Sequence, residues 1–193
     1  MTSKKRCDWV NLANPEYCSY HDQEWGVPVH DDNTFFEFLI LEGAQAGLSW
    51  ETILKRREGY TRCFANFDPQ KVATFSTKDV ETILTDVGVI RNKLKVKGAV
   101  QNAQAFLKVQ SEFGSFSNYI WQFVDNTPII NHWEKISEIP PTSSHATVLS
   151  KDLKKRGFTF VGPTIMYALM QATGLVMDHT KDCFRYTQLL NQK

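Results

Sequence analysis

No apolar stretch of this sequence is long enough to cross a bilayer, because a spanning helix needs roughly 20 consecutive apolar residues. The basic start, Met1 to Cys7, is not followed by an apolar segment, which argues against a secretory signal. The chain has only four cysteines in 193 residues, too few for a scaffold held by disulfides. These absences predict a reduced, cytoplasmic protein with no membrane partner.

An excess of charge of one sign is also missing, since 22 basic residues face 21 acidic ones. This balance excludes a protein held to nucleic acid by bulk charge alone, but it allows a local basic face. The cations gather at 55–57, 91–97 and 151–156. We expect the first two groups to be solvated helix faces, whereas the third lies beside a hairpin described below.

The spacing of apolar residues predicts an all-α chain, because it follows a helical period and never alternates with period two. A chain of this length can bury one core, so we expect one domain over 1–193 and a monomer. Expected helix starts are a capping box at Thr34 and Glu37, an N-cap at Ser49, and an N-cap with proline at Asp68 and Pro69.

Further helices are expected at about 92–108, 115–124, 146–156 and 164–174, and Gly88 is expected to close a helix with an apolar face over 80–87. Prolines and serines forbid a continuous helix between about 125 and 145. The two ends, about 1–30 and 175–193, lack amphipathic periodicity. Something other than a helical face must therefore hold them.

Two cysteine and histidine pairs near the ends are candidate metal ligands. Cys7 and His21 lie near the N-terminus, and His179 and Cys183 stand four residues apart near the C-terminus. Two thiolates and two imidazoles suit tetrahedral zinc, and a structural site would stabilise the irregular ends. Four protein ligands would close the site, so it would not generate hydroxide. Taken alone, the spacing favours a buried cysteine with surface histidines over a metal site. Cys18 is expected to be a small core residue.

The segment from Lys154 to Thr164 joins two expected helices. Gly157 suits a left-handed residue after the first helix, and Gly162 lets the backbone approach a ligand. A helix that starts at Pro163 points free N–H groups outward, where they can bind a DNA phosphate. The segment resembles a helix-hairpin-helix DNA-binding element at about 146–174, but it could equally be a tight turn with exposed lysines.

Glu42 follows an apolar run at 35–41 and precedes small residues that lead to Leu48, Ser49 and Trp50. Such a carboxylate either faces solvent or is held in a pocket. Aromatic residues upstream would suit the sandwiching of a flipped base, and a cationic base would be attracted by their faces: Trp9, Tyr17, Tyr20 and Trp25. Leu48, beside Gly47, could enter the vacated base stack. Core packing is the alternative for each aromatic residue.

Together these residues resemble the 3-methyladenine DNA glycosylase I family of bacteria. The resemblance runs from about Cys7 to Cys183, nearly the whole chain. Its strings are YHDxEWGVP at 20–28, LEGxQAGLSW at 41–50, KKRGFxFVG at 154–162 and HxxxC at 179–183. Ala44 departs from the family, which more often has glutamine there.

The resemblance implies a helix-hairpin-helix glycosylase fold with structural zinc on Cys7, His21, His179 and Cys183. It implies a monofunctional enzyme that hydrolyses the N-glycosidic bond of 3-methyladenine in alkylated double-stranded DNA, without a lyase step. The residues it implies are catalytic Glu42, base-binding Tyr20 and Trp50 with Tyr17, Trp9 and Trp25 as neighbours, and DNA-contacting Leu48, Gly47, Gly162 and Thr164.

One further acidic residue, Asp178, is considered but given no catalytic role. Asp178 is nearest to the catalytic aspartate of other helix-hairpin-helix glycosylases, but it adjoins a candidate zinc ligand. No lysine stands out as a Schiff-base nucleophile. Two rival interpretations remain: a non-catalytic nucleic-acid-binding module, which would release no base, and a zinc hydrolase, which would need one of the four ligands to be off the metal.

Overall fold

The computed structural model describes residues 4–191, and it is mostly helical. The α-helices are α1 (Pro15–Gln23), α2 (Asp32–Gln45), α3 (Trp50–Leu54), α4 (Arg57–Cys63), α5 (Pro69–Val72), α6 (Thr77–Ile83), α7 (Lys93–Phe113), α8 (Phe116–Trp121), α9 (Ser144–Lys155), α10 (Pro163–Ala172) and α11 (Phe184–Leu190). Short 3-10 turns occupy Ala65–Phe67, Gln122–Val124 and Ile136–Glu138. The expectation of a helical chain is confirmed.

One small strand pair accompanies the helices in the described part of the chain. The two-residue strands β1 (Ile129–Ile130) and β2 (Val176–Met177) pair in parallel, with Ile129 opposite Val176. The pair fastens the proline-rich segment after α8 to the segment after α10. This explains how the stretch at 125–145 is held although it forms no continuous helix.

Local capping chemistry sets most helix starts. Ser49 caps α3, and Asp68 caps α5 with Pro69 in the first turn, as expected. The expected capping box at Thr34 is wrong, because Asp31 caps α2 and accepts a hydrogen bond from the Thr34 amide at 2.8 Å. An aspartate is a stronger N-cap than a threonine, so the helix begins three residues earlier.

Two other expectations about helix limits are wrong. Helix α6 ends at Ile83 with Leu84 as its C-cap, so Gly88 does not close it. The N-terminal segment contains α1, which the weak periodicity had concealed. Its signal was the pair Asn14–Pro15, in which the asparagine side chain accepts from the amides of Glu16 and Tyr17 and the proline occupies the first turn.

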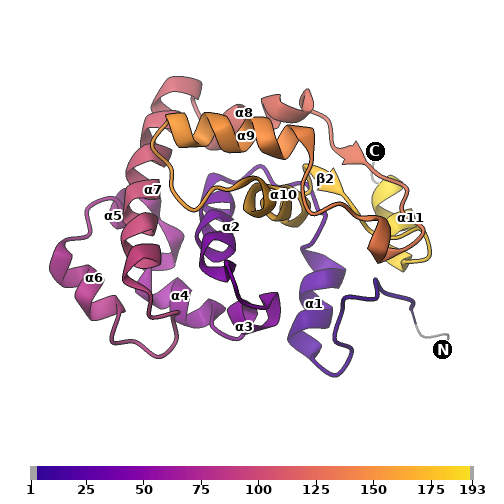
Figure 1. The fold of residues 1–193 in the computed structure, drawn as a ribbon, viewed down its shortest axis with the longest axis horizontal. Coiled ribbons are helices and arrows are strands. Elements are labelled where there is room, and N and C mark those ends of the chain that lie inside the picture. The colour runs from indigo at the N-terminus through magenta and orange to yellow at the C-terminus, as the bar shows by residue number, and fades with distance from the viewer. Residues whose placement is uncertain (1–3, 192–193) are drawn as a thin grey trace.

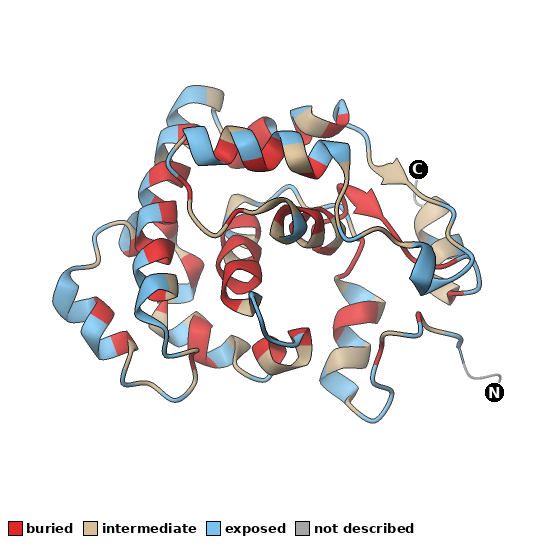
Figure 2. Ribbon diagram, viewed as in Figure 1, coloured by how far each residue is buried: buried red, intermediate tan, exposed pale blue. Residues whose placement is uncertain are grey.

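The core surrounds α2, whose middle is buried on every side from Phe38 to Ala44. Figure 2 shows α2 and α10 as the most buried helices at the centre of the molecule. Helix α7 runs beside α2, and α9 lies across the upper end of the view in Figure 1. A helix that is apolar all round suits this position, because it can be buried only between neighbours. Glu42 is therefore carried inside the protein by its own helix.

The N-terminal segment and the region of β2 and α11 meet at one end of the molecule (Figure 1). The Phe184 amide donates to the Lys5 carbonyl at 2.9 Å, and Gly174 lies against Val27 and Pro28. Gly174 has φ +71°, and a Cβ there would lie 2.4 Å from the Val27 carbonyl carbon, so only glycine fits. The two ends are thus packed together.

None of the helices in residues 4–191 has the length and the apolar character that a membrane span requires.

The expectation of a solvated face at 55–57 holds for Lys55, whose side chain is 60% exposed, but is wrong for Arg57. Arg57 donates to Glu37 at 2.7 Å and to Glu24 at 2.9 Å, and its side chain is only 24% exposed. The ion pairs join α4 to α2 and to the residue after α1. Half-buried arginine is well matched to carboxylates, so this cation is structural.

Candidate functional site

The four candidate metal ligands come together in one buried cluster. The ligand atoms of Cys7, His21, His179 and Cys183 all lie within 4.8 Å of one another. Cys183 Sγ lies 3.4 Å from His21 Nε2 and 3.5 Å from His179 Nδ1. A tetrahedral zinc with ordinary Zn–S and Zn–N distances would place S and N about 3.5 Å apart. The donor set therefore fits a tetrahedral metal ion.

The outer nitrogen of each histidine ring is engaged away from the cluster. His21 Nδ1 lies 2.8 Å from Asp22 Oδ1, and Arg6 donates to the same carboxylate. His179 Nε2 lies 2.9 Å from the Trp25 carbonyl oxygen. Both acceptors require a ring N–H, which leaves the lone pair of the inner nitrogen directed into the cluster. Carboxylate and carbonyl partners of this kind orient metal-binding histidines.

A cavity of about 310 Å³ lies beside this cluster. It is lined by Trp9, Tyr17, Tyr20, Trp25, Glu42, Gln45, Trp50, Ile136, Ile139, Ala168 and Gln171. Glu42, Tyr20 and Trp50 are among them, together with the three expected neighbours Tyr17, Trp9 and Trp25. The lining is mostly aromatic, with a small number of polar groups, and this is the usual character of a small-molecule site.

Glu42 is the acidic group of the cavity. Its side chain is 4% exposed, and its Oε2 atom has no hydrogen-bond partner. Burial raises the pKa of Glu42 to about 8, because a charged carboxylate is poorly solvated there. The indole Nε1 of Trp50 is a second buried polar atom without a partner. Unpaired polar atoms are rare inside proteins, and a ligand with matching polar atoms would satisfy both.

The aromatic rings of the cavity pack against one another in tilted or edge-to-face pairs. The ring centroids of Tyr20 and Trp50 are 5.3 Å apart, and Trp9 lies 5.3 Å from Tyr17 and 5.0 Å from Trp25. Trp9 and Tyr17 are only partly buried, whereas Tyr20 and Trp50 are buried. Aromatic rings and one carboxylate thus line the same cavity, a composition that suits a planar cation.

Asp178 is a fully buried carboxylate whose lone pairs are engaged. Asn131 and Trp133 donate to Oδ1 at 2.7 and 2.8 Å, and Tyr167 and Gln171 donate to Oδ2 at 2.6 and 2.7 Å. Four donors fill the acceptor capacity of a carboxylate. It is therefore a structural hub that joins the segment after β1 to α10, and it has no free lone pair for a water molecule.

The hairpin between α9 and α10 has the expected glycine geometry. Gly157 follows α9 with φ +94°, and Gly162 is the N-cap of α10 with Pro163 in its first turn. Asn102 of α7 binds the hairpin through two hydrogen bonds. Its side chain accepts from the Thr159 amide at 2.8 Å and donates to the Thr159 carbonyl at 3.0 Å. Thr164 is exposed in the first turn of α10.

Not all basic side chains beside the hairpin are free to contact a ligand. Arg156 donates to Asp152 at 2.6 Å and to Glu112 at 2.7 Å, so it is engaged within the protein. Lys151, Lys154 and Lys155 are exposed on α9. The basic group next to the hairpin is thus made of lysines.

The turn after α2 presents its leucine to the outside. Gly47 has φ +81°, which glycine adopts without strain, and Leu48 is 40% exposed. Ser49 then starts α3, whose first residue is the cavity residue Trp50. A large apolar side chain is therefore exposed two residues before the cavity wall.

Several cavity residues were not identified from the sequence. Gln45 is one helical turn after Glu42, a spacing that could have placed it on the same face. Gln171 and Ala168 come from α10, and Ile136 and Ile139 come from the irregular segment. Nothing local marks the two isoleucines, because the long-range pairing of β1 with β2 sets their position.

Comparisons with known proteins all identify the same enzyme family. The family model described as methyladenine glycosylase matches residues 9–186. DNA-3-methyladenine glycosylase 1 of Escherichia coli is 48% identical over 182 residues, which cover 94% of this chain and 97% of the relative. DNA-3-methyladenine glycosylase of Haemophilus influenzae is 44% identical, with 92% and 96% covered.

Solved structures show the same likeness. A crystal structure of 3-methyladenine DNA glycosylase I has a TM-score of 0.91 at 47% identity, with 93% of this chain and 98% of that chain covered. A Staphylococcus aureus structure, described as the basis of 3-methyladenine recognition, has a TM-score of 0.87 at 39% identity, with 89% and 91% covered.

Proposed function

The chain belongs to the methyladenine glycosylase family, and from this premise we propose that it hydrolyses the N-glycosidic bond of 3-methyladenine in alkylated double-stranded DNA. The observation that carries the proposal is the buried Glu42 carboxylate in an aromatic cavity of about 310 Å³, with one carboxylate oxygen unpartnered. That cavity is of a size and chemistry suited to a flipped purine. We further propose that residues 1–193 form a single glycosylase domain and act as a monomer.

The chemistry of the substrate reduces what the protein must supply. A purine methylated at N3 carries a positive charge in DNA, and it leaves as a neutral base when the glycosidic bond breaks. No proton has to be donated to the leaving group, so a strong general acid is not needed. The protein has to extrude the nucleotide, bind the base and support the sugar cation until water attacks it.

Glu42 is the group that we assign to the base edge. A carboxylate accepts hydrogen bonds from an exocyclic amino group, and its charge complements a cationic ring. Burial favours the protonated form in the empty cavity, as the raised pKa of about 8 indicates. A cationic base would offset that effect, because an opposite charge at close range favours the ionised carboxyl. The site therefore matches a charged base better than a neutral one.

The aromatic residues would hold the base between their faces. We assign Tyr20 and Trp50 to direct contact, since both are buried and flank Glu42 in the cavity. Trp9 and Tyr17 would complete the outer wall. Cation–π attraction contributes about 0.5–2 kcal/mol per contact, which favours an alkylated purine over an ordinary one.

Contacts with DNA would come from the turn after α2 and from the hairpin. Leu48, presented by Gly47, would fill the space that the flipped nucleotide leaves in the stack. The N-terminus of α10, at Gly162 and Thr164, would bind a backbone phosphate through free amides, as in a helix-hairpin-helix element. The exposed lysines of α9 would add salt-dependent affinity.

The cluster of Cys7, His21, His179 and Cys183 would hold one structural Zn²⁺. The support for zinc is the donor set, its sulfur–nitrogen spacing and the engaged outer nitrogens of both histidines. A closed tetrahedral site has no position for water, so the ion would stabilise the packed ends and take no part in hydrolysis. This also weighs against the zinc hydrolase alternative.

We propose a monofunctional enzyme because no lysine lines the cavity among the described residues. A lyase step would need an amine to form a Schiff base with the sugar. Borohydride reduction during the reaction should trap no covalent complex of protein and damaged DNA. Formation of such a complex would overturn the assignment.

The decisive experiment is release of free base from methylated duplex DNA by the wild type and Glu42→Gln in parallel. We expect 3-methyladenine release by the wild type and at least a 100-fold loss in the variant, with DNA affinity within about threefold. Equal activity of the two proteins would remove the role of Glu42. No release by a folded, metal-loaded wild type would favour a non-catalytic DNA-binding module.

A further inference from the structure

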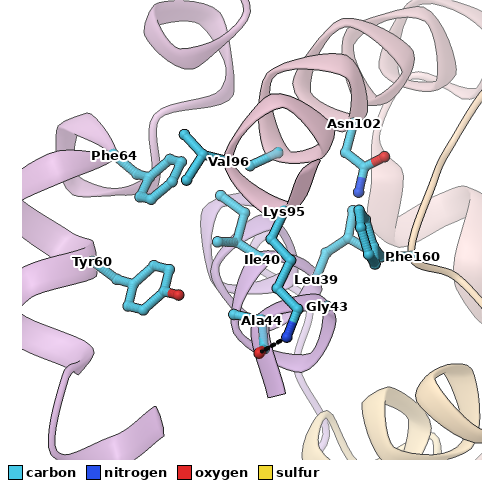
Figure 3. A pocket seen from close by; sticks show the side chains of 11 residues that line it. Leu39, Ile40, Gly43, Ala44, Tyr60, Phe64, Lys95, Val96, Asn102 and Phe160 are labelled. Carbon is cyan, nitrogen blue, oxygen red and sulfur yellow. Dashed lines mark hydrogen bonds between the residues drawn. The ribbon is translucent and has the colours of Figure 1, made fainter. Parts of the chain in front are cut away.

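Lys95 of α7 is bound to the end of the helix that carries Glu42. Its Nζ donates to the carbonyl oxygen of Ala44 at 2.8 Å (Figure 3). It also donates to the carbonyl oxygen of Ala46 at 2.8 Å. Burial lowers the pKa of Lys95, and no charged neighbour contributes to that shift. The expectation of a solvated lysine face at 91–97 is thus wrong for this residue. Its charge is matched by the C-terminal carbonyls of α2.

The space around Lys95 leaves no room for a ligand. The cavity there measures only about 10 Å³, the space of roughly one water molecule. Its walls are mainly apolar, including Leu39, Phe64 and Phe160 (Figure 3). The ammonium therefore serves a contact inside the protein.

The carbonyls that Lys95 binds lie directly before the exposed turn. Ala46 is the C-cap of α2 and leaves the helix with φ −42° and ψ 112°. Gly47 then takes a left-handed conformation, and the Leu48 amide donates back to the Gln45 carbonyl at 2.6 Å. Fixing the Ala46 carbonyl fixes the direction in which the chain enters this turn. No other side chain in the described residues donates to it.

The same face of α7 also holds the hairpin. Asn102 stands seven residues after Lys95, two helical turns along the same face, and binds both backbone groups of Thr159. Gly98 lies between them, where a Cβ would come within 2.8 Å of Thr159 Cγ2 and 2.9 Å of the Phe160 ring. One rigid helix therefore contacts the turn at one point and the hairpin at another.

We propose that Lys95 is a positioning residue that holds the Leu48 turn at a fixed distance from the hairpin, through α7. This rests on the proposed function, in which Leu48 enters the base stack while the hairpin holds a backbone phosphate. Both contacts must be made on one duplex at the same time. A turn free to shift by about an ångström could not make both contacts at once. Misplacement on that scale lowers the rate of catalysis.

The test compares Lys95→Met, Lys95→Arg and Lys97→Met as full-length, metal-loaded proteins. Methionine keeps the length of the side chain and removes the donors, whereas arginine keeps the charge and the donors. Lys97 is exposed on the same helix, so Lys97→Met controls for losing one positive charge near DNA. Measured are the single-turnover rate of 3-methyladenine release from duplex DNA and the affinity for free 3-methyladenine, read from tryptophan fluorescence.

Lys95→Met should slow release from duplex roughly tenfold while changing free-base affinity less than about twofold. Lys95→Arg should recover most of the rate, and Lys97→Met should match the wild type. A parallel fall in free-base affinity would overturn the proposal, since Lys95 would then support the cavity as a whole. Equal rates for Lys95→Met and Lys97→Met would overturn it as well.

Hydrogen exchange provides a second measurement that does not depend on catalysis. The amides of residues 46–49 should exchange faster in Lys95→Met than in Lys97→Met, and unchanged exchange would contradict the proposal. If Lys95→Met does not fold, Lys95→Gln takes its place in both measurements, because its amide is neutral and one bond shorter than the lysine side chain. Absence of base release by the wild type would instead count against the proposed function, while the exchange comparison would still test the contact.

Discussion

Glu42 and Asp178 are both buried carboxylates, but Asp178 accepts four hydrogen bonds while Glu42 Oε2 accepts none. The difference separates a carboxylate whose acceptor sites are filled from one with an unused acceptor. A carboxylate with four donors is stabilised and occupied, whereas one with an empty oxygen keeps capacity for a ligand. The buried Glu42 oxygen without a partner thus lowers the stability of the folded protein. The same oxygen can accept a hydrogen bond from a ligand.

The first prediction concerns the pH dependence of stability. The folded protein holds a proton on Glu42 up to a pKa of about 8, whereas an unfolded chain releases it near the ordinary value of 4.5. Folded chains therefore bind more protons between these values, and the free energy of unfolding falls as the pH rises through this window. Glu42→Gln cannot ionise, so its advantage in Tm should grow from pH 5 to pH 8, to roughly 5 °C or more.

Glu81→Gln is the matched control, because it removes an exposed carboxylate from α6. Its Tm difference from the wild type should stay flat over the same range. A flat difference for Glu42→Gln as well would show that Glu42 is ionised in the free protein.

The second prediction concerns Tyr167, which donates to Asp178 at 2.6 Å. Tyr167→Phe removes one of the four donors and should lower the Tm by roughly 3–6 °C, as expected for one lost hydrogen bond to a charged group. The rate of base release at 25 °C and its pH profile should not change, because Asp178 takes no part in the reaction. A displaced pH profile would show that Asp178 acts as a base after all.

The third prediction concerns the metal. The purified protein should contain one zinc ion per chain, and Cys183→Ser should lose it together with at least about 10 °C in Tm. Cobalt substitution should give the thiolate charge-transfer bands of a tetrahedral site with two sulfurs. Cys18→Ser provides the control, since Cys18 lies outside the cluster. Full stability of the metal-free protein would remove the structural role.

The fourth prediction concerns Leu48. Truncation by Leu48→Ala should slow base release from duplex DNA roughly tenfold, because extrusion of the nucleotide loses its support. The Tm should change little, since the side chain is 40% exposed. Val87→Ala truncates another exposed residue and should behave as the wild type. Identical rates for the two variants would exclude Leu48 from the stack.

Local signals predicted much of the helical framework. The starts of α3 and α5 follow from Ser49 and from Asp68 with Pro69, because a capping side chain satisfies amides a few residues away. Gly157 was placed correctly for the same reason, since a left-handed residue after a helix is a local requirement. The prediction of a capping box at Thr34 was wrong because Asp31 competes for the same amides.

The cavity was only partly predictable. Glu42, Tyr20 and Trp50 were identified from their residue types and from the family resemblance, and they do meet in one cavity. Ile136 and Gln171 were missed, because a strand pair and a buried carboxylate place them, and both depend on contacts between distant segments. Lys95 was misjudged for a similar reason: its partners are backbone carbonyls, which no pattern of side chains reveals.

The meeting of Cys7 with Cys183 and both histidines has a mechanical consequence. A metal ion bound by these four residues would cross-link the two ends of the chain. The cross-link would close a loop that contains every helix from α1 to α10. Tension applied at the two ends would then load the metal–ligand bonds before it reached the hydrophobic contacts inside this loop. The helices that surround Glu42 would be shielded from pulling forces, and the cluster would be the element whose rupture sets the strength of the fold.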